Sequence, residues 1–155
     1  MNRNDMIELI KNFPAKITEL VTNLSENQLD TPYGEGKWTV REVIHHLADS
    51  HMNGYARMKW ILTENNPELK PYDQDKWTEL ADSKLPITIS LLILKGLHDR
   101  MAYLLENLLE DDWKRTAYHA EEGDLSMAWM LEAYSNHGEK HYGHIKSLLD
   151  RMGWK

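Results

Sequence analysis

His137-Gly-Glu-Lys-His141-Tyr-Gly-His144, near the C-terminus, is the stretch around which this chain is organised. Its three histidines are spaced by four and then three residues. On an α-helix these spacings place side chains on one face, one above the other. Two such imidazoles can hold a cation, as the His-x-x-x-His half of a zinc-protease motif does. The stretch therefore indicates a helix on which His137 and His141 either supply two metal ligands or form a surface or capping pair.

One helix face rarely completes a metal site, so a further ligand must come from elsewhere in the chain. The run His45-His46-Leu-Ala-Asp49-Ser-His51 offers candidates. Metal binding by histidine needs neutral imidazoles whose orientation is fixed by hydrogen-bond acceptors. Asp49, Glu132 and Glu139 are close enough in the sequence to be those acceptors. We therefore expect a metal site made by two helices.

Length and composition describe an ordinary globular protein. The 155 residues are 41% hydrophobic and 28% charged, which suits a single domain, 1–155, with a real buried core. No apolar run approaches the roughly 18 residues of a membrane span. No signal peptide is visible at the N-terminus, so we expect a cytoplasmic protein that does not bind membranes.

Cysteine content and charge exclude several classes of protein. Cysteine is absent, which removes disulfides, zinc–thiolate sites and a cysteine nucleophile. The net charge of −7 argues against a nucleic-acid-binding protein. Any metal must therefore be held by nitrogen and oxygen ligands. The six Trp and seven Tyr suit a pocket wall or an interface, or a core in which their polar tips are satisfied.

Hydrophobic periodicity predicts four long helices and no strand of comparable length. We expect them from Asn4 to Leu24, from Val40 to about Thr63, from Pro86 to the closing Glu110-Asp-Asp112, and from the N-cap Ser126 through Met152. Pro14 should kink or divide the first helix. Capping boxes begin at Ser25 and Thr39. This pattern predicts an all-α four-helix bundle, a fold that builds sites from facing helices.

The segments between these helices have their own signals. Pro and Gly content predicts a loop over residues 31–37. Residues 72–77 are expected to form a short helical turn, and residues 118–123 a second loop.

The run Trp38-Thr-Val-Arg-Glu-Val-Ile-His-His-Leu-Ala-Asp-Ser-His-Met-Asn53 resembles the signature of the DinB superfamily, and closely that of its YfiT-like subgroup of metal-dependent hydrolases. Further matches extend the resemblance from Leu29 to the C-terminus: Leu29-Asp-Thr-Pro-Tyr33, Pro71-Tyr-Asp73, Leu97-His98 and Arg151-Met-Gly-Trp154. The resemblance implies an up-down-down-up four-helix bundle and a homodimer.

The resemblance also implies a metal held by three histidines. They are His46, the second histidine of the His-His-Leu-Ala-Asp run, and the pair His137 and His141 on the last helix. Relatives can be richer in histidine between the last two, whereas this chain has Gly138-Glu-Lys140. Because the ligand spacing is kept, the expected site stands.

The other histidines are expected around the three predicted ligands or on the surface. His144 shares the stripe of His137 and His141, either as a fourth ligand or, the interpretation we favour, as a residue that lines the pocket or hydrogen-bonds within the bundle. His45 and His51 point away from His46 on a regular helix. They are expected behind the ligands or on the surface. His98, on the third helix, could face the site.

Three protein ligands leave open coordination positions, as in catalytic zinc sites. A metal there can activate water or polarise a carbonyl, which predicts a hydrolase of a small substrate. It could instead stabilise a bound thiolate, which predicts a transferase joining a low-molecular-weight, bacillithiol-like thiol to an electrophile. A non-enzymatic metal-binding bundle is the third hypothesis. Nitrogen ligands suit several divalent transition metals; zinc is the first choice and nickel the second.

Several residues are candidates to act beside the metal. The possible general bases are Glu42, Asp49, Asp73 and Glu139. The transferase hypothesis predicts a neutral or basic pocket for an anionic thiol, with Arg57, Arg100 and Lys140 as candidates to line it.

Overall fold

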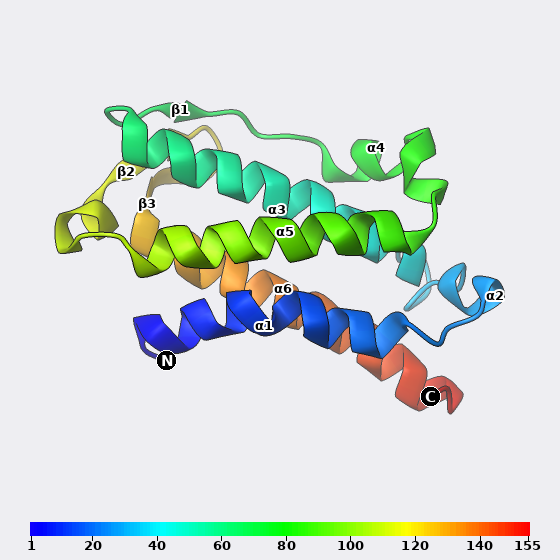
Figure 1. Cartoon of the computed structure of the whole chain (residues 1–155). Coiled ribbons are helices and arrows are strands. Elements are labelled where there is room, and N and C mark those ends of the chain that lie inside the picture. Colours follow the sequence, from blue (N-terminus) through cyan, green and yellow to red (C-terminus); the bar gives the residue numbers. More distant parts are fainter.

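Four long helices form a bundle in the computed structural model, which describes residues 1–155 (Figure 1). They are α1 (Arg3–Val21), α3 (Val40–Thr63), α5 (Ile87–Glu106) and α6 (Met127–Met152). The predicted all-α four-helix bundle is confirmed. Two predicted ends were too long: α1 stops at Val21 and α5 at Glu106, since the apolar pattern continues into the turns that follow.

The direction of the helices follows the expected up-down-down-up order. In Figure 1, α1 and α6 run one way, and α3 and α5 run the other. Each of α1 and α3 packs against both α5 and α6, so α1 and α3 lie diagonally across the bundle. A long connection after α3 returns the chain along the bundle, so that α5 begins at the same end of the bundle as α3 (Figure 1). This topology sets α3 against α6, the two helices with the predicted ligands.

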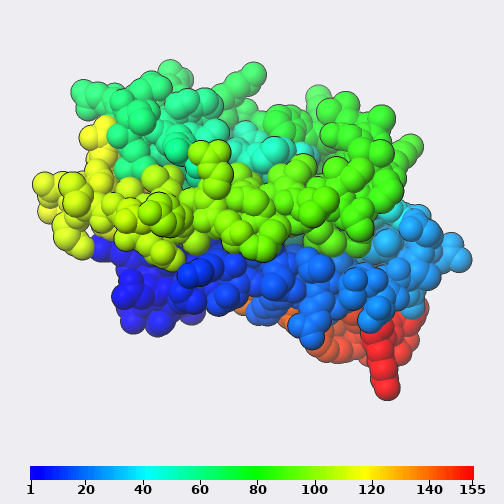
Figure 2. All heavy atoms as spheres, viewed as in Figure 1, coloured from blue at the N-terminus to red at the C-terminus, as the bar shows by residue number.

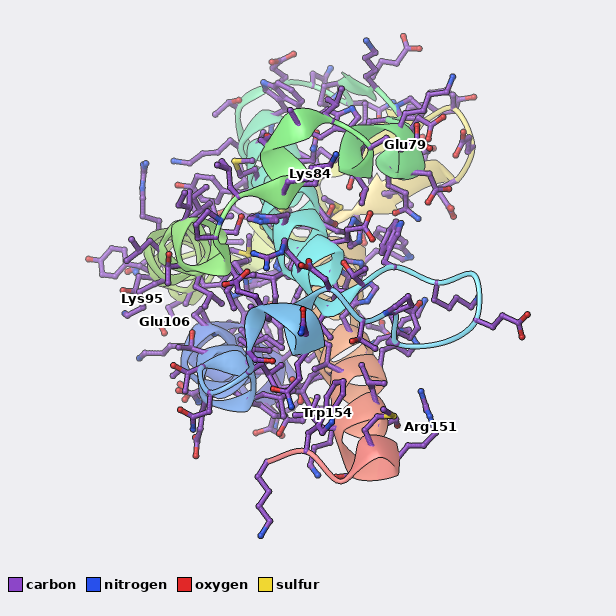
Figure 3. The ribbon with its side chains drawn as sticks, turned by 90° about the vertical axis from the view of Figure 1, so that its right-hand side faces the viewer. Glu79, Lys84, Lys95, Glu106, Arg151 and Trp154 are labelled. Carbon is purple, nitrogen blue, oxygen red and sulfur yellow. The ribbon has the colours of Figure 1, made fainter.

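The connection between α3 and α5 covers one side of the bundle. It contains β1 (Glu68–Leu69), α4 (Gln74–Thr78) and a 3₁₀ turn, η1 (Ala81–Lys84). Both α4 and η1 pack on α3, and Figure 3 shows Glu79 and Lys84 on this side of the molecule. The predicted helical turn at residues 72–77 is confirmed as α4. The connection thus borders the space beside the histidines of α3.

Side-chain caps fix where the helices begin, as the sequence predicted. Ser25 and Thr39 form capping boxes at the starts of the short α2 (Glu26–Leu29) and of α3. The hydroxyl of Ser126 accepts the backbone N–H of Trp129, and Gly153, with φ of 70°, ends α6. These contacts satisfy backbone groups that a helix end would otherwise leave unpaired.

Pro14 does not divide the first helix. Proline lacks an N–H and its ring opposes the carbonyl four residues earlier, so it usually breaks a helix. α1 nevertheless continues through Pro14, and its neighbours Phe13 and Ile17 are completely buried. Of the two predicted outcomes, a kink or a division, the division was wrong, because tertiary packing on both sides of Pro14 outweighs the local preference.

A small sheet, which the sequence did not predict, leads the chain into α6. After η2 (Glu110–Lys114), β2 (Thr116–His119) and β3 (Gly123–Ser126) pair antiparallel, and β1 pairs parallel to β2. Residues 118–123 were expected to form a loop, whereas they complete β2, turn and start β3. Strands of two to four residues are too short for alternation to reveal them.

The core consists of two apolar clusters separated by a layer of buried polar side chains. Each of the four long helices contributes to both clusters. One cluster contains Ile10, Met58, Met101 and Met130, and the other, toward the opposite end of the bundle, contains Ile17, Leu47, Leu94 and Ile145. Between these positions in three of the helices, α3, α5 and α6, lie the buried His51, His98 and His141. Buried polar groups are costly unless they are hydrogen-bonded, so this layer is the natural place for a functional site.

The outer face over α1 and α5 is closed, with side chains lying against one another along both helices (Figure 2). None of the helices combines the length and the apolar character needed to cross a membrane.

Candidate metal centre

The three predicted ligands come together between α3 and α6. One nitrogen from each of His46, His137 and His141 lies within 4.8 Å of the others. The Nε2 atoms of His46 and His137 are 3.3 Å apart. His46 and His141 are buried, and His137 is half-buried. Residues 91 positions apart in the sequence thus form one cluster.

The spacing and chemistry of this cluster fit a metal ion. Two nitrogens at Zn–N distances of about 2.0–2.1 Å from a tetrahedral zinc lie about 3.3 Å apart. This is the separation found between His46 and His137. The three residues offer only imidazole nitrogen, which suits zinc, nickel, copper and iron.

Burial keeps the three imidazoles neutral. It lowers the pKa of His137 to about 4, with Lys140 adding to the effect. Burial, followed by the nearby His137, lowers the pKa of His46 to about 3 and that of His141 to about 2. A neutral imidazole is the form that can give a lone pair to a metal, so the cluster is ready to bind one at neutral pH.

Aromatic side chains from the loop before α3 pack against the histidine cluster and its neighbour His144. The ring of Trp38 lies 4.4 Å from that of His46, centroid to centroid. Tyr33 stacks on His144 at 4.5 Å, with the ring planes 7° apart. His144 in turn has its Nδ1 atom 3.4 Å from the Nδ1 atom of His141. His144 is therefore placed behind a ligand, outside the group of three nitrogens, as the favoured interpretation had it.

The carboxylates expected behind the ligands are not there. Glu139 instead forms an ion pair with Lys16 at 2.6 Å, and neither Glu132 nor Asp49 hydrogen-bonds a ligand histidine. The Nδ1 atom of His137 contacts another histidine, with His51 Nε2 at 3.1 Å. The expectation was wrong because sequence proximity does not show which side of a helix faces the partner helix.

Three of the four candidate general bases have other roles. Glu42 and Asp73 cap helices α3 and α4, and Glu139 pairs with Lys16. Asp49 is half-buried, and burial, followed by the charge of Asp82, raises its pKa to about 6. A carboxyl group with a pKa near neutrality can exchange protons at working pH, so Asp49 is the strongest acid–base candidate of the four.

Two cavities border the cluster, and His137 lines both. One has a volume of about 350 Å³ and is also lined by Ser50, Arg57, Tyr72 and Tyr134. The other has a volume of about 410 Å³ and is also lined by Trp38, Lys140, His141 and His144. Of the basic residues proposed to line a pocket, Arg57 and Lys140 do so. Arg100 does not, and lies over the ring of Tyr55.

An up-down-down-up helix bundle with three clustered histidines beside open cavities defines a class of helical proteins built to hold a metal. The model of the DinB superfamily matches residues 9–145. The chain belongs to this superfamily, and the resemblance read from the sequence is confirmed.

Similar proteins carry names of one kind. A relative from Bacillus cereus (strain 03BB102) is 47% identical over 148 residues, covering 96% of this chain and 86% of the relative. One from Bacillus anthracis (strain CDC 684 / NRRL 3495) is 46% identical over the same coverage. Both are named "Putative metal-dependent hydrolase". These names give a class of activity for the relatives and no substrate.

Solved structures share the fold. YfiT from Bacillus subtilis, described as "a probable metal-dependent hydrolase with an unusual four-helix bundle topology", matches with a TM-score of 0.96 at 42% identity, over 99% of this chain and 89% of YfiT. A mycothiol-dependent maleylpyruvate isomerase matches with a TM-score of 0.74 at 16% identity, over 94% of this chain and 61% of the isomerase. The second likeness concerns the fold alone.

Proposed function

We propose that this protein is a metal-dependent hydrolase in which His46, His137 and His141 hold one divalent transition metal, zinc first and nickel second. The observation that carries the proposal is the placing of three neutral imidazoles at the border of two cavities. Three protein ligands leave room for a further group, which is the arrangement of catalytic rather than structural zinc. The names of the relatives support the same activity.

The bound metal would supply Lewis acidity toward water or a carbonyl group. The chain's own residues define what surrounds it. Tyr72 and Tyr134 line the cavity of about 350 Å³ together with Ser50 and His137, and the four come from α3, the connection before α4, and α6. Asp49 lies three residues after His46 on α3, and its charge acts on Tyr72 of this cavity. With this position and a pKa of about 6, it is the proposed proton acceptor and donor.

The substrate we propose is a small molecule with an anionic group. Arg57 lines the cavity of about 350 Å³ and donates a hydrogen bond from Nη2 to the carbonyl of Lys70 at 2.8 Å. This contact uses only part of the guanidinium, whose other N–H groups can bind a carboxylate or phosphate. Glu121 and Glu122 also line this cavity, but both are exposed.

The test compares metal-free and metal-loaded protein on a panel of small esters, amides and lactones with and without a carboxylate. We expect hydrolysis that needs zinc or nickel, is lost in His46→Ala, and prefers the anionic substrates. Replacing Arg57 with Gln should raise KM for the anionic substrates with little change for the neutral ones. Loaded protein that hydrolyses none of the panel, or activity that survives chelation, would contradict the proposal.

A thiol S-transferase is the second candidate, favoured by the basic residues of the cavities. Arg57 lines one cavity and Lys140 the other, on either side of His137. Two positive charges beside a metal suit an anionic low-molecular-weight thiol. Consumption of thiol and electrophile together by loaded protein, without hydrolysis of the ester panel, would select this function. Metal binding with neither activity would favour a non-enzymatic bundle.

A further inference from the structure

A line of hydrogen bonds crosses all four long helices and ends on one of the three clustered histidines. It starts at the backbone carbonyl of Ile10 on α1, which lies 2.7 Å from Nδ1 of His98 on α5. His98 Nε2 lies 2.7 Å from Nδ1 of His51 on α3. His51 Nε2 lies 3.1 Å from Nδ1 of His137 on α6. Two completely buried histidines thus connect His137 to a backbone group across the bundle.

The first contact fixes which group donates and which accepts in each of the later hydrogen bonds. A carbonyl oxygen only accepts, so the proton of His98 is on Nδ1. A neutral imidazole has one N–H, which leaves His98 Nε2 as the acceptor for the N–H of His51 Nδ1. By the same step, His51 Nε2 accepts the N–H of His137 Nδ1. The remaining nitrogen of His137, Nε2, then has a free lone pair, 3.3 Å from Nε2 of His46.

The surroundings of the two intermediate histidines favour this neutral arrangement. The ring of Phe13 lies 5.7 Å from His98 and 6.2 Å from His51, centroid to centroid. The rings of Tyr134 and His51 meet in a T-shaped arrangement, with their centroids 5.3 Å apart. Burial lowers the pKa of His98 despite the hydrogen bond to Ile10 and the charge of Asp99, which act the other way. A second proton on this line would reverse its direction and block Nε2 of His137.

We propose that the carbonyl of Ile10, acting through His98 and His51, fixes the tautomer and the ring orientation of His137 so that its Nε2 lone pair faces the metal. The inference rests on the proposed metal centre and deepens it. Hydrogen bonds behind a ligand commonly set which nitrogen binds. His98 and His51 are positioning residues: they act through His137 and are not themselves ligands. The line also makes the ligand sensitive to the packing of helices that carry no ligand, α1 and α5.

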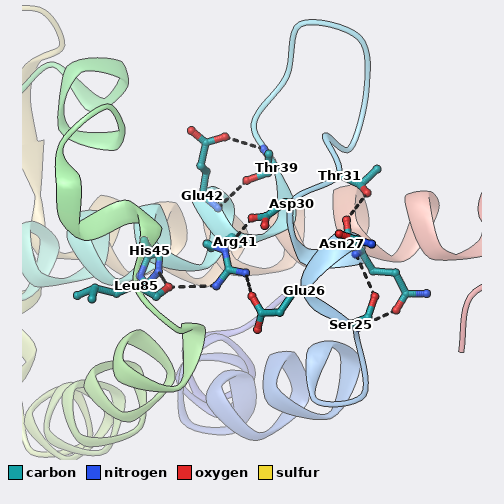
Figure 4. Close-up of polar contacts among 11 residues, drawn as sticks. Ser25, Glu26, Asn27, Asp30, Thr31, Thr39, Arg41, Glu42, His45 and Leu85 are labelled. Carbon is teal, nitrogen blue, oxygen red and sulfur yellow. Dashed lines mark hydrogen bonds and ion pairs between the residues drawn. The ribbon is translucent and has the colours of Figure 1, made fainter.

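His45 provides a matched control on the same helix. It is buried, like His51, and makes two hydrogen bonds. Its Nε2 donates to the carbonyl of Leu85 at 2.8 Å, which leaves Nδ1 to accept the hydroxyl of Ser90 at 2.6 Å. Figure 4 shows this contact beside Arg41, which donates to the same carbonyl. His45 is therefore assigned the opposite tautomer, and its contacts lead to α5 and to the residue that follows η1 rather than to a predicted ligand.

The first test reads the tautomers directly in the metal-free protein. Long-range ¹H–¹⁵N correlation spectra at neutral pH distinguish the protonated ring nitrogen from the bare one. We expect the proton on Nδ1 in His98, His51 and His137, and on Nε2 in His45. A proton on Nε2 of His51 or His137 would overturn the inference. Because this readout needs neither metal nor substrate, it separates the inference from the proposed function.

The second test measures zinc affinity by competition with a chromophoric chelator. The variant His98→Met keeps an apolar side chain of similar reach but breaks the line, and it should bind zinc about 10–100-fold more weakly. His98→Gln can donate to Ile10 and accept from His51, so it should recover most of the affinity. His45→Met, the control, should bind as the parent does.

Circular dichroism and unfolding curves would establish that the variants fold. Equal zinc affinity in His98→Met and the parent would overturn the inference, as would equal losses in His98→Met and His45→Met. A parent that binds no zinc but shows the expected tautomers would contradict the proposed function while supporting the line of hydrogen bonds.

Discussion

Individual histidines in this protein are held neutral by burial, and this has a consequence for stability. The pKa of His46 is about 3 when folded, against about 6.5 in an unfolded chain. Between these values the unfolded chain binds a proton that the folded chain does not, so the free energy of unfolding falls as the pH falls below about 6.5. His137 and His141 act in the same direction.

We therefore predict that the metal-free protein loses stability on acidification. His46 alone should cost about 2 kcal/mol between pH 8 and pH 5. Urea unfolding at a series of pH values measures this, and His141→Gln should show a shallower dependence than the parent because one buried group is gone. A stability that is constant or rises toward pH 5 would contradict the neutral state of the cluster.

The effect of Asp49 on the pH dependence of stability has the opposite sign to that of the histidines. Its pKa is about 6 when folded, against about 3.9 when unfolded. The fold therefore favours the protonated form, and Asp49 weakens the fold at pH values above about 6. Because the side chain is only half-buried, solvent screening reduces the effect.

We predict that Asp49→Asn raises the free energy of unfolding at pH 7.5 by up to about 1 kcal/mol, a gain that vanishes near pH 4. The same variant should lower kcat if Asp49 moves a proton during hydrolysis, since active-site groups are often retained at a cost in stability. Urea unfolding and the ester assay measure the two effects. Asp111→Asn, in η2 and with a side chain that is 98% exposed, is the control and should change neither.

At the level of single residues, the sequence predicted which histidines would cluster but not what holds them. His137 and His141 were predicted from helical spacing, and His46 from the family resemblance. His51 and His98 were named as histidines near the site, but their roles depend on which faces of four helices meet. That arrangement is set by packing among distant residues, which no local pattern in the sequence records.

Glycines determine how closely the helices with the ligands approach. A Cβ at Gly54 of α3 would lie 2.3 Å from Cζ of Tyr134 on α6, and one at Gly138 would lie 3.0 Å from the ring of Phe13 on α1. Neither ring can move freely, since both pack against His51. The glycine between His137 and His141 is thus explained by the close approach of α1.

We predict that Gly54→Ala destabilises the protein by about 1–3 kcal/mol, because the added methyl group forces Tyr134 and the helices apart. Gly143→Ala is the control. It lies on α6 with open space at the Cβ position, so the better helix former should stabilise the protein by up to about 1 kcal/mol. Thermal or urea unfolding measures both, and similar effects of the two changes would refute the role of Gly54.

Elements with strong local signals were predictable, and those without them were not. The capping residues Ser25, Thr39 and Ser126 each predicted the start of a helix, and Gly153 predicted an end. The sheet of β1, β2 and β3 was missed because its strands are short. Pro14 does not divide α1, because burial of its neighbours overrides its local preference.

For the whole molecule, the topology explains why the site lies where it does. The long connection lets α3 and α5 run in the same direction. α6 then completes the bundle beside α3, so the predicted ligands on α3 and α6 meet (Figure 1). The order of helices followed from the family resemblance rather than from periodicity, which gives helices but no directions.

The state of assembly stays a prediction from the same resemblance. We expect a homodimer, and light scattering on the eluting protein should give twice the chain mass of 18.2 kDa. The outer side of α5 exposes apolar residues such as Leu92, which is 74% exposed. A mass of one chain at all concentrations tested would contradict the prediction without touching the metal centre.

The central claim is that α3 and α6 together hold a metal, and metal content tests it most directly. Elemental analysis would be made on untagged protein purified without added metal, beside His46→Ala, His137→Ala and the control His45→Ala. We predict about one zinc or nickel ion per chain in the parent and the control, and none in the two ligand variants, all folded by circular dichroism. A parent that is empty and cannot be loaded with zinc or nickel, or ligand variants that keep the metal, would contradict the account.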